Sequence, residues 1–254
     1  MSTLSYQVQT WGTVVLIELS SQKEDQEKLL IAAKEAEEFL LKVDTLFSTY
    51  RNDSQISLLR SNKLEIESAD DLVKEVWQSC LAARQLTQGA FDPWVVEGGF
   101  DPSGYVKGWA ADKCGLIFEK HGVENFLVNA AGDISVRGGL LDGDVVKPWP
   151  IQIRNPEKFD EVVKDIPINN GAVATSGVGE KGSHIKDPFT ELIAIGALSA
   201  TVIGPDGGLA EALATALVVA GKDGAAWFNN PELADYSAFV IDRHSDTSWS
   251  ISSH

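Results

Sequence analysis

The order in which expected strands follow one another limits the fold of this chain more than any other feature. Segments that read as strands, such as 124–129 and 134–137, are joined by tight turns and not by helices. Antiparallel strands can be joined by a short turn, whereas parallel strands need a long crossover connection. The chain is therefore expected to form an α+β fold with mostly antiparallel sheets and packed helices, and not a doubly wound parallel sheet.

Apolar periodicity and breaker residues set the other expected boundaries. The expected helices are 24–47, a short one through Leu59 capped by Asp53 or Ser54, 69–87 capped by Ser68, one that starts within 101–112 and stops at Gly122, 208–220 ended by Gly221, and 224–229. The other expected strands are 6–19 with a bend at Gly12, 63–67, 149–154, 171–176, 194–203, 238–242 and 248–252. Residues 138–148 and 177–192 are expected to be loop or irregular.

Length and charge narrow the possible functions. At 254 residues the chain can bury a sizeable core, and it contains neither a solenoid repeat nor a separating linker, so a single domain, 1–254, is expected. The formal net charge is -16 at pH 7. A chain of this sign repels phosphate backbones, so nucleic acid is not an expected partner. An anionic small molecule would need a local cation or a metal ion.

The N-terminus and the cysteines indicate a compartment. Residues 1–12 contain no Lys or Arg and the apolar run 14–17 is short, so no export signal is expected. No segment reaches membrane-spanning length. Cys80 and Cys114 lie inside apolar helical patterns and are expected to be buried free thiols, which fits a reducing compartment. The expected location is the cytoplasm.

The segment 101–112 is the most informative loop. It starts as a loop that contains Pro102 and Gly104 and then becomes helical. The loop therefore leads into a helix N-terminus, which aims unpaired backbone N–H groups and the positive end of a helix dipole at whatever lies in front. Lys107 adds a cation near that point, and Asp101 adds a carboxylate just upstream. Such a segment can hold an anion and a hydrogen-bonded organic group, although an ordinary capped helix with a solvated Lys fits the same residues.

A glycine motif at 177–182 points to a different fold and is rejected. The segment spells G-x-G-x-x-G after an expected strand, as in dinucleotide-binding folds. Those folds need a helix that opens within the motif. Here Pro188 follows and prevents a sustained helix. A Gly-rich loop beside His184 can still contact phosphates.

Seven segments, taken together and in order, resemble the ApbE family. They are 47–53 (FSTYRND), 89–93 (GAFDP), 101–112 (DPSGYVKGWAAD), 128–138 (VNAAGDISVRG), 173–177 (VATSG), 183–188 (SHIKDP) and 211–221 (EALATALVVAG). The resemblance implies a fold of two interleaved T-fold-like α+β halves. It also implies an enzyme that binds FAD with Mg²⁺ and attaches the FMN moiety to a Thr or Ser hydroxyl of an acceptor protein, releasing AMP.

The resemblance also implies which residues bind FAD. Tyr50 takes the place of the aromatic residue that packs on the flavin, and Trp11 matches a position near the isoalloxazine. The other implied FAD-binding residues are Ala90, Phe91, Asp92, Asp101, Lys107 and Ile185.

The implied metal ligands are Glu211, Thr215 and the backbone carbonyl of Gly104. Residues 211 and 215 are four apart, which places both on one face of a helix, one turn apart. Glu211 stands where the family usually has Asp. A glutamate is still a hard oxygen ligand, but it is longer by one methylene, and Mg²⁺ tolerates little distortion of its octahedron.

Two residues have expected catalytic roles. Lys107 is a second cation beside the pyrophosphate, and His184 is the candidate base for the acceptor hydroxyl, since imidazole titrates near neutral pH. Two alternatives remain open at this point. One is a Mg²⁺-dependent FAD pyrophosphatase that forms FMN and AMP, and the other is an FAD-binding module without catalysis.

Overall fold

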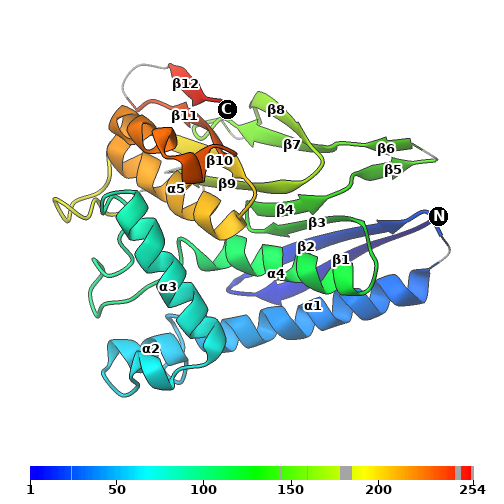
Figure 1. The fold of residues 1–254 in the computed structure, drawn as a ribbon, viewed down its shortest axis with the longest axis horizontal. Coiled ribbons are helices and arrows are strands. Elements are labelled where there is room, and N and C mark those ends of the chain that lie inside the picture. Colours follow the sequence, from blue (N-terminus) through cyan, green and yellow to red (C-terminus); the bar gives the residue numbers. More distant parts are fainter. Residues whose placement is uncertain (24, 144, 159, 178–184, 244–246, 253–254) are drawn as a thin grey trace.

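The structure is a computed structural model that describes residues 1–23, 25–143, 145–158, 160–177, 185–243 and 247–252. Within these ranges the fold is built around one antiparallel sheet of eight strands, which the chain forms in two runs of four (Figure 1). The α+β class with mostly antiparallel sheets is therefore confirmed. None of the helices in these ranges combines the length and the apolar content that a membrane crossing needs.

The first run of strands carries its helices between the second and third strands. Its elements are β1 (Ser2–Thr10), β2 (Thr13–Ser21), α1 (Gln26–Phe47), α2 (Gln55–Arg60), η1 (Ile66–Ser68), α3 (Asp71–Leu86), α4 (Val106–Lys120), β3 (Asn125–Ala130) and β4 (Asp133–Arg137). Ala130 pairs with Val15 on one side and with Asp133 on the other, so β3 lies between β2 and β4.

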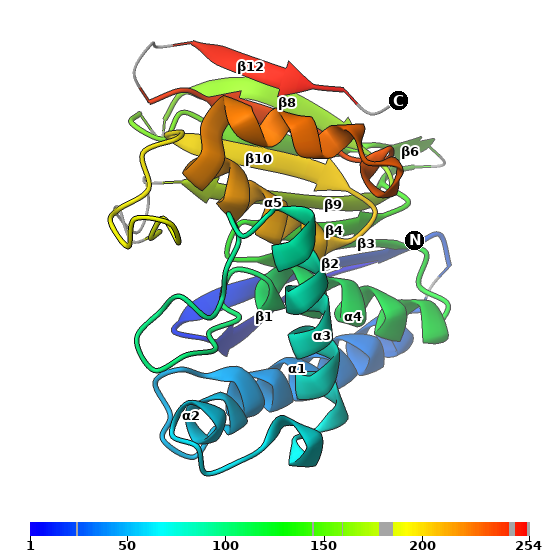
Figure 2. The same ribbon diagram turned by 60° about the vertical axis from the view of Figure 1, so that its left-hand side comes forward.

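The second run repeats this plan with one long helix. Its elements are β9 (Gly171–Gly177), β10 (Ser199–Gly204), α5 (Gly207–Ala220), η2 (Gly221–Asn229), η3 (Pro231–Leu233), β11 (Ser237–Ile241) and β12 (Ser248–Ile251). The two halves join where β4 pairs with β9, and the sheet order is β1-β2-β3-β4-β9-β10-β11-β12. Helix α4 of the first half and α5 of the second lie side by side on one face of this sheet (Figure 2).

Two hairpins connect the halves. They are β5 (Leu140–Asp142) with β6 (Val145–Lys147), and β7 (Trp149–Arg154) with β8 (Val162–Ile168). The β7–β8 hairpin covers the face of the sheet that the helices leave free, and Trp149 and Ile151 pack there with Val136 of β4 and Val173 of β9. The sheet therefore has a buried layer on both faces at the join.

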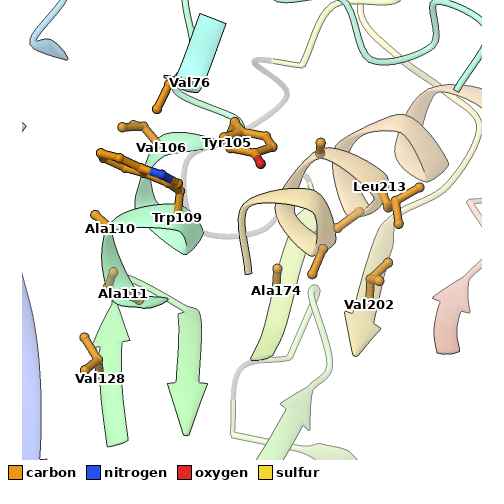
Figure 3. Close-up of a cluster of buried hydrophobic side chains, with 14 of the residues drawn as sticks. Val76, Tyr105, Val106, Trp109, Ala110, Ala111, Val128, Ala174, Val202 and Leu213 are labelled. Carbon is orange, nitrogen blue, oxygen red and sulfur yellow. The ribbon is translucent and has the colours of Figure 1, made fainter. Parts of the chain in front are cut away.

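The larger core lies between the sheet and helices α1, α4 and α5. Figure 3 shows Trp109 and Ala111 of α4, Val128 of β3, Val202 of β10 and Leu213 of α5 converging in this layer. Each of these side chains is buried. Helices and strands from both halves therefore contribute to one continuous apolar cluster.

Helices α4 and α5 approach each other unusually closely at their first turns. A Cβ on Gly108 would overlap the carbonyl oxygen of Gly207, and a Cβ on Gly207 would lie 2.8 Å from the carbonyl oxygen of Gly108. Only glycine fits at such a backbone contact. The contact fixes Lys107, the residue before Gly108, opposite the first turns of α5.

The expected single strand at 6–19 is wrong, because the chain reverses there. Residues of β1 and β2 form a hairpin in which Thr10 pairs with Thr13. Trp11 and Gly12 form its turn with φ of 54° and 68°. A two-residue turn with positive φ at both positions matches the twist of the flanking strands. The bend expected at Gly12 is in fact a complete turn.

Other local expectations also need correction. Residues 63–65 form no strand, and the 3₁₀-helix η1 follows at Ile66–Ser68. The cap of α3 is Asp70 and not Ser68, since the Asp70 carboxylate accepts the hydrogen bond from Leu72 N. The expected loop 138–148 contains the β5–β6 hairpin, and β8 had no expected counterpart. By contrast, Ser54 caps α2, and β7 spans the expected residues.

Candidate functional site

A large open pocket lies at the edge where the two halves meet. Its volume is about 1070 Å³. The wall is built from the β1–β2 turn, the end of α1, the segment 90–107, the β3–β4 turn, β7, β9, residues 185–188 and the first turns of α5. A pocket of this size is large enough for a dinucleotide.

The structure brings the predicted site residues together. Every one of them that lies in the described ranges lines this pocket: Trp11, Tyr50, Ala90, Phe91, Asp92, Asp101, Gly104, Lys107, Ile185, Glu211 and Thr215. These residues span 205 positions of the chain and come from both halves. Their separation in sequence and their meeting at one cavity make a chance arrangement improbable.

Three charged groups form a compact cluster in the pocket wall. Lys107 Nζ forms an ion pair with Asp133 Oδ2 at 2.8 Å, and a second ion pair with Glu211 Oε1. The side chains of Asp133 and Glu211 are only 5% and 3% exposed, so this cluster is largely shielded from water. Two carboxylates surround one ammonium, and the cluster therefore carries one negative charge in excess. Buried charges of this kind need further compensation.

Glu211 is positioned by the backbone of the other helix. Its second carboxylate oxygen, Oε2, accepts a hydrogen bond from Gly108 N at 3.0 Å. This N–H lies in the first turn of α4, where it has no partner within its own helix. Glu211 therefore satisfies a helix terminus with one oxygen and contacts Lys107 with the other.

Thr215 lies beside the loop that precedes α4. Its hydroxyl is 2.9 Å from the Ser176 hydroxyl of β9. A Cβ on Gly104 would lie 3.4 Å from Thr215 Oγ1 and 3.2 Å from the Phe91 ring. The Gly104 backbone and the Thr215 hydroxyl therefore approach each other because residue 104 has no side chain.

The donor chemistry at this wall fits Mg²⁺. Mg²⁺ takes oxygen ligands and is commonly held by one or two carboxylates together with the phosphates of a substrate. Glu211 and Thr215 supply a carboxylate and a hydroxyl from one face of α5, next to the Gly104 backbone. Within the described ranges, no group of three or more His, Cys, Asp or Glu residues could hold a metal by itself. A metal here would rely on backbone, hydroxyl and substrate oxygens.

Two aromatic residues also line the pocket. Tyr50 follows α1 and is 96% exposed, so its ring is free to pack against a planar ligand. Trp11 is held in the β1–β2 turn with positive φ. Its Nε1 is buried and has no hydrogen-bond partner in the described part of the chain. A buried N–H donor without a partner is costly, so a ligand acceptor at this point would be stabilising.

Two predicted acids already have partners in the pocket rim. Asp92 accepts a hydrogen bond from Trp94 N at 2.9 Å and pairs with Arg84 at 2.7 Å. Asp101 accepts from Ser103 N at 3.0 Å and lies 3.9 Å from Arg60. Both carboxylates therefore shape the loop between α3 and α4.

Comparison with known proteins gives this pocket a family. The model described as "ApbE family" matches residues 11–98 and 96–239, which is most of the chain. The chain belongs to the ApbE family. The membership predicted from the seven motifs is confirmed.

Curated relatives in this family carry the name FAD:protein FMN transferase. One from Vibrio cholerae is 35% identical over 134 residues, which cover 48% of this chain and 39% of the relative. One from Haemophilus influenzae is 26% identical over 255 residues, which cover 75% of this chain and 72% of the relative. The match thus spans less than half of the Vibrio cholerae relative and most of the Haemophilus influenzae one.

Solved structures of the family share the fold over nearly the whole chain. The flavin transferase ApbE from Vibrio cholerae superposes with a TM-score of 0.84 at 24% identity and covers 99% of this chain and 98% of that one. The ApbE protein from Thermotoga maritima gives a TM-score of 0.79 at 26% identity, with 94% of each chain covered. The arrangement of the two halves is therefore an ApbE fold.

One predicted ApbE site residue cannot be placed. His184, the candidate base, lies outside the described residues. Its neighbour Ile185 is half-buried and packs against the main core at the pocket edge.

Sequence reasoning gave no role to Asp133 or Ser176. Both lie within motifs that carry the ApbE resemblance, and both contact predicted site residues. The available signal was an acidic residue directly after the tight turn Ala131–Gly132. An acid at the start of a strand has many ordinary explanations, so its position opposite Lys107 became visible only in the fold.

Proposed function

We propose that the protein transfers the FMN moiety of FAD to a Thr or Ser hydroxyl of an acceptor protein, with Mg²⁺, and releases AMP. The observation that carries this proposal is the buried cluster of Lys107, Asp133 and Glu211 beside Thr215. It lies in the wall of a dinucleotide-sized pocket that Trp11 and Tyr50 also line. The names of the family relatives support the same reaction.

Two groups of pocket residues would bind FAD. Tyr50 and Trp11 would hold the isoalloxazine, with Ala90 and Phe91 lining the cavity beside it. Lys107 would then face the pyrophosphate, whose negative oxygens match its ammonium group. Positioning and charge compensation provide most of the catalysis in phosphoryl transfer. The pocket therefore orients the phosphorus atom of the FMN half toward an incoming hydroxyl.

The bound metal would supply further charge compensation for the pyrophosphate oxygens. Glu211, Thr215 and the carbonyl of Gly104 would hold it. In the reaction, the acceptor oxygen forms a bond to the phosphorus of the FMN half while the bond from that phosphorus to the bridging oxygen breaks. AMP leaves with the bridging oxygen, and the hydroxyl proton passes to a base. We assign that base to His184, because it stands beside the pocket residue Ile185 in the sequence.

The test is an incubation of the purified protein with FAD, Mg²⁺ and a lysate as a source of acceptor proteins. The expected result is flavin fluorescence that stays with denatured protein, a mass gain of one FMN group on a Thr or Ser, and an equal amount of AMP. EDTA should abolish the transfer, and Glu211→Gln should lower its rate about 100-fold. Asp142→Asn removes an exposed acid outside the pocket and serves as the matched control.

Two results would contradict the proposal. AMP with free FMN and no labelled protein would show a pyrophosphatase, since water would then take the place of the hydroxyl. Bound FAD that remains intact with Mg²⁺ and acceptor present would show a binding module.

A further inference from the structure

We infer that Asp133 is a positioning residue that holds the Lys107 ammonium toward the pyrophosphate, so that Glu211 is free to bind the metal. This inference rests on the proposed function and deepens it. It assigns a task to a buried acid that the resemblance leaves without one, and it divides the work of the two carboxylates.

The backbone presents Asp133 rigidly. Asp133 is the first residue of β4 and pairs in register with Ala130 of β3. The turn between them has positive φ at Ala131 (57°) and Gly132 (101°). The side chain of Asn129 accepts a hydrogen bond from Gly132 N at 2.8 Å and fixes this turn further. A carboxylate on such a support keeps its place when a ligand binds.

Three oxygen atoms surround the Lys107 ammonium. An ammonium group has three N–H donors and no acceptor. In the structure Nζ donates hydrogen bonds to the Ser103 carbonyl at 3.2 Å and to Glu211 Oε1, and it forms an ion pair with Asp133 Oδ2 at 2.8 Å. A phosphate oxygen that approaches the ammonium competes with these three partners.

Glu211 is the partner that gives way. It is an implied metal ligand, and a cation bound to its carboxylate competes directly with the ammonium of Lys107. Asp133 and the Ser103 carbonyl then stay with the ammonium, and the N–H that Glu211 releases turns to a phosphate oxygen. Asp133 thereby maintains the direction of the ammonium while its neighbour changes partner.

This division of roles predicts whether the loss of Asp133 strengthens or weakens the binding of FAD. If Asp133 acted only as a buried negative charge, its loss would reduce repulsion and strengthen the binding of the anionic FAD. If it positions Lys107, its loss leaves the ammonium paired with Glu211 alone. Both FAD and Mg²⁺ then have to break that pair, so both would bind more weakly.

The experiment is a double-mutant cycle of Asp133→Asn and Lys107→Met, measured by quenching of flavin fluorescence without any acceptor. FAD affinity is measured in EDTA and with Mg²⁺, and Mg²⁺ affinity is measured by calorimetry in the absence of FAD. Asp133→Asn should weaken FAD binding about tenfold, and the double variant should equal Lys107→Met, which is the coupling expected of residues in one network. Asp142→Asn, which also changes an ion-paired acid to an amide, should match the wild type.

Three outcomes would overturn the inference. The first is equal or tighter FAD binding by Asp133→Asn. The second is a loss in the double variant that equals the sum of the two single losses. The third is weaker Mg²⁺ binding on replacing Asp133 in the Lys107→Met background, which would make Asp133 a metal ligand.

A second variant covers a failure of Asp133→Asn to fold, which circular dichroism would reveal. Asp133→Glu keeps the charge but displaces the carboxylate by one methylene, so its effect on FAD binding should vanish when Lys107 is Met. An equal effect in both backgrounds would refute the positioning role. Failure of FMN transfer in the wild type would refute the proposed function alone, because these binding measurements use neither acceptor nor turnover.

Discussion

The contact between α4 and α5 contains two carboxylates that make reciprocal hydrogen bonds but have different surroundings. Glu211 of α5 accepts from Gly108 N of α4 at 3.0 Å, and Asp112 of α4 accepts from Gly207 N of α5 at 2.6 Å. Glu211 faces the pocket and pairs with Lys107. Asp112 lies one turn further along α4 and is not among the residues that line the pocket.

The surroundings of Asp112 change the pKa of its carboxyl group. The pKa of this carboxyl is raised to about 6, chiefly by burial and also by the charge of Asp206, although the hydrogen bonds from Gly207 N and Ser135 and the charge of Lys113 oppose the rise. The partners of Asp112 thus compensate its charge incompletely, whereas Glu211 is ion-paired with Lys107. The same backbone arrangement serves structure at one site and, in the proposed function, metal binding at the other.

The largest expected effect comes from breaking the contact that both carboxylates share. In Gly108→Ala the new methyl overlaps the Gly207 carbonyl, so the helices must separate. The free energy of unfolding should fall by about 3 kcal/mol, as overpacking of a tight contact does. FAD binding should be lost because Lys107 and Glu211 move apart. Urea unfolding and flavin fluorescence measure the two effects.

A control gives the cost of replacing a glycine by alanine where no crowding results. Gly143 has a φ of 61°, and a Cβ there would meet no atom within 4 Å. Gly143→Ala should therefore cost about 1 kcal/mol, from the left-handed backbone alone. A loss in Gly108→Ala no larger than this would show that α4 and α5 can adjust without separating.

The next effect distinguishes the two carboxylates by function. Glu211→Gln keeps an acceptor for Gly108 N but removes the charge, so FMN transfer should fall about 100-fold, as on losing one preorganised electrostatic group. Asp112→Asn makes the same chemical change at the reciprocal position, and transfer should be unchanged. Initial rates at saturating FAD measure both. Equal losses in the two variants would refute the division between structure and chemistry.

The pH dependence of the unfolding free energy tests the surroundings of Asp112 directly. The folded pKa of Asp112 is about 6 and its ordinary value is 3.8, so the folded state binds this proton more tightly than the unfolded chain does. The resulting stability is complete below pH 3.8 and is lost as the pH rises to about 6. Asp112→Asn lacks this dependence.

Between pH 4 and pH 7 the wild type should therefore lose about 2 kcal/mol of unfolding free energy relative to Asp112→Asn. Urea unfolding of both proteins across this range measures the difference. Other carboxylates titrate equally in the two proteins and cancel. A difference that does not change with pH would mean that Asp112 has an ordinary pKa.

The smallest expected effect comes from Ser176, which contacts the implied metal ligand Thr215. Ser176→Ala removes the hydroxyl that lies 2.9 Å from Thr215 Oγ1, so the Thr215 side chain gains rotational freedom. The Mg²⁺ concentration for half-maximal transfer should rise about threefold, the size of one net hydrogen bond. Thr201→Val is the matched control, since its hydroxyl bonds to Thr175 on the neighbouring strand. An unchanged Mg²⁺ dependence in Ser176→Ala would show that Thr215 needs no such support.

Elements with strong local signals were predictable from the sequence. The stripe of α1, the Ser54 cap of α2 and the glycine end of α5 at Gly221 depend on residues within a few positions of one another. Exposed strands gave no such signal. In β8 the first four residues are exposed, and its aliphatic and charged side chains do not alternate from one residue to the next. Nothing in the sequence therefore marked Val162–Ile168 as a strand.

The site was predictable only in part, and for a different reason. Pocket residues such as Tyr50 and Thr215 were assigned through the ApbE resemblance, because no local pattern relates positions 165 residues apart. Asp133 was missed since its partner, Lys107, is 26 residues away and on another element. The reciprocal glycine contact was missed too, because Gly108 and Gly207 are ordinary loop and helix residues until the helices meet.

The junction of the halves also determines when in synthesis the site can exist. A growing polypeptide that has emerged from the ribosome only as far as β4 contains Lys107 and Asp133, but Glu211 and Thr215 have not yet been made. Helix α5 docks against α4 only after the second half has been translated. Nascent chains and products truncated before α5 therefore lack the complete cluster of Lys107, Asp133 and Glu211, and with it the centre proposed to act on FAD.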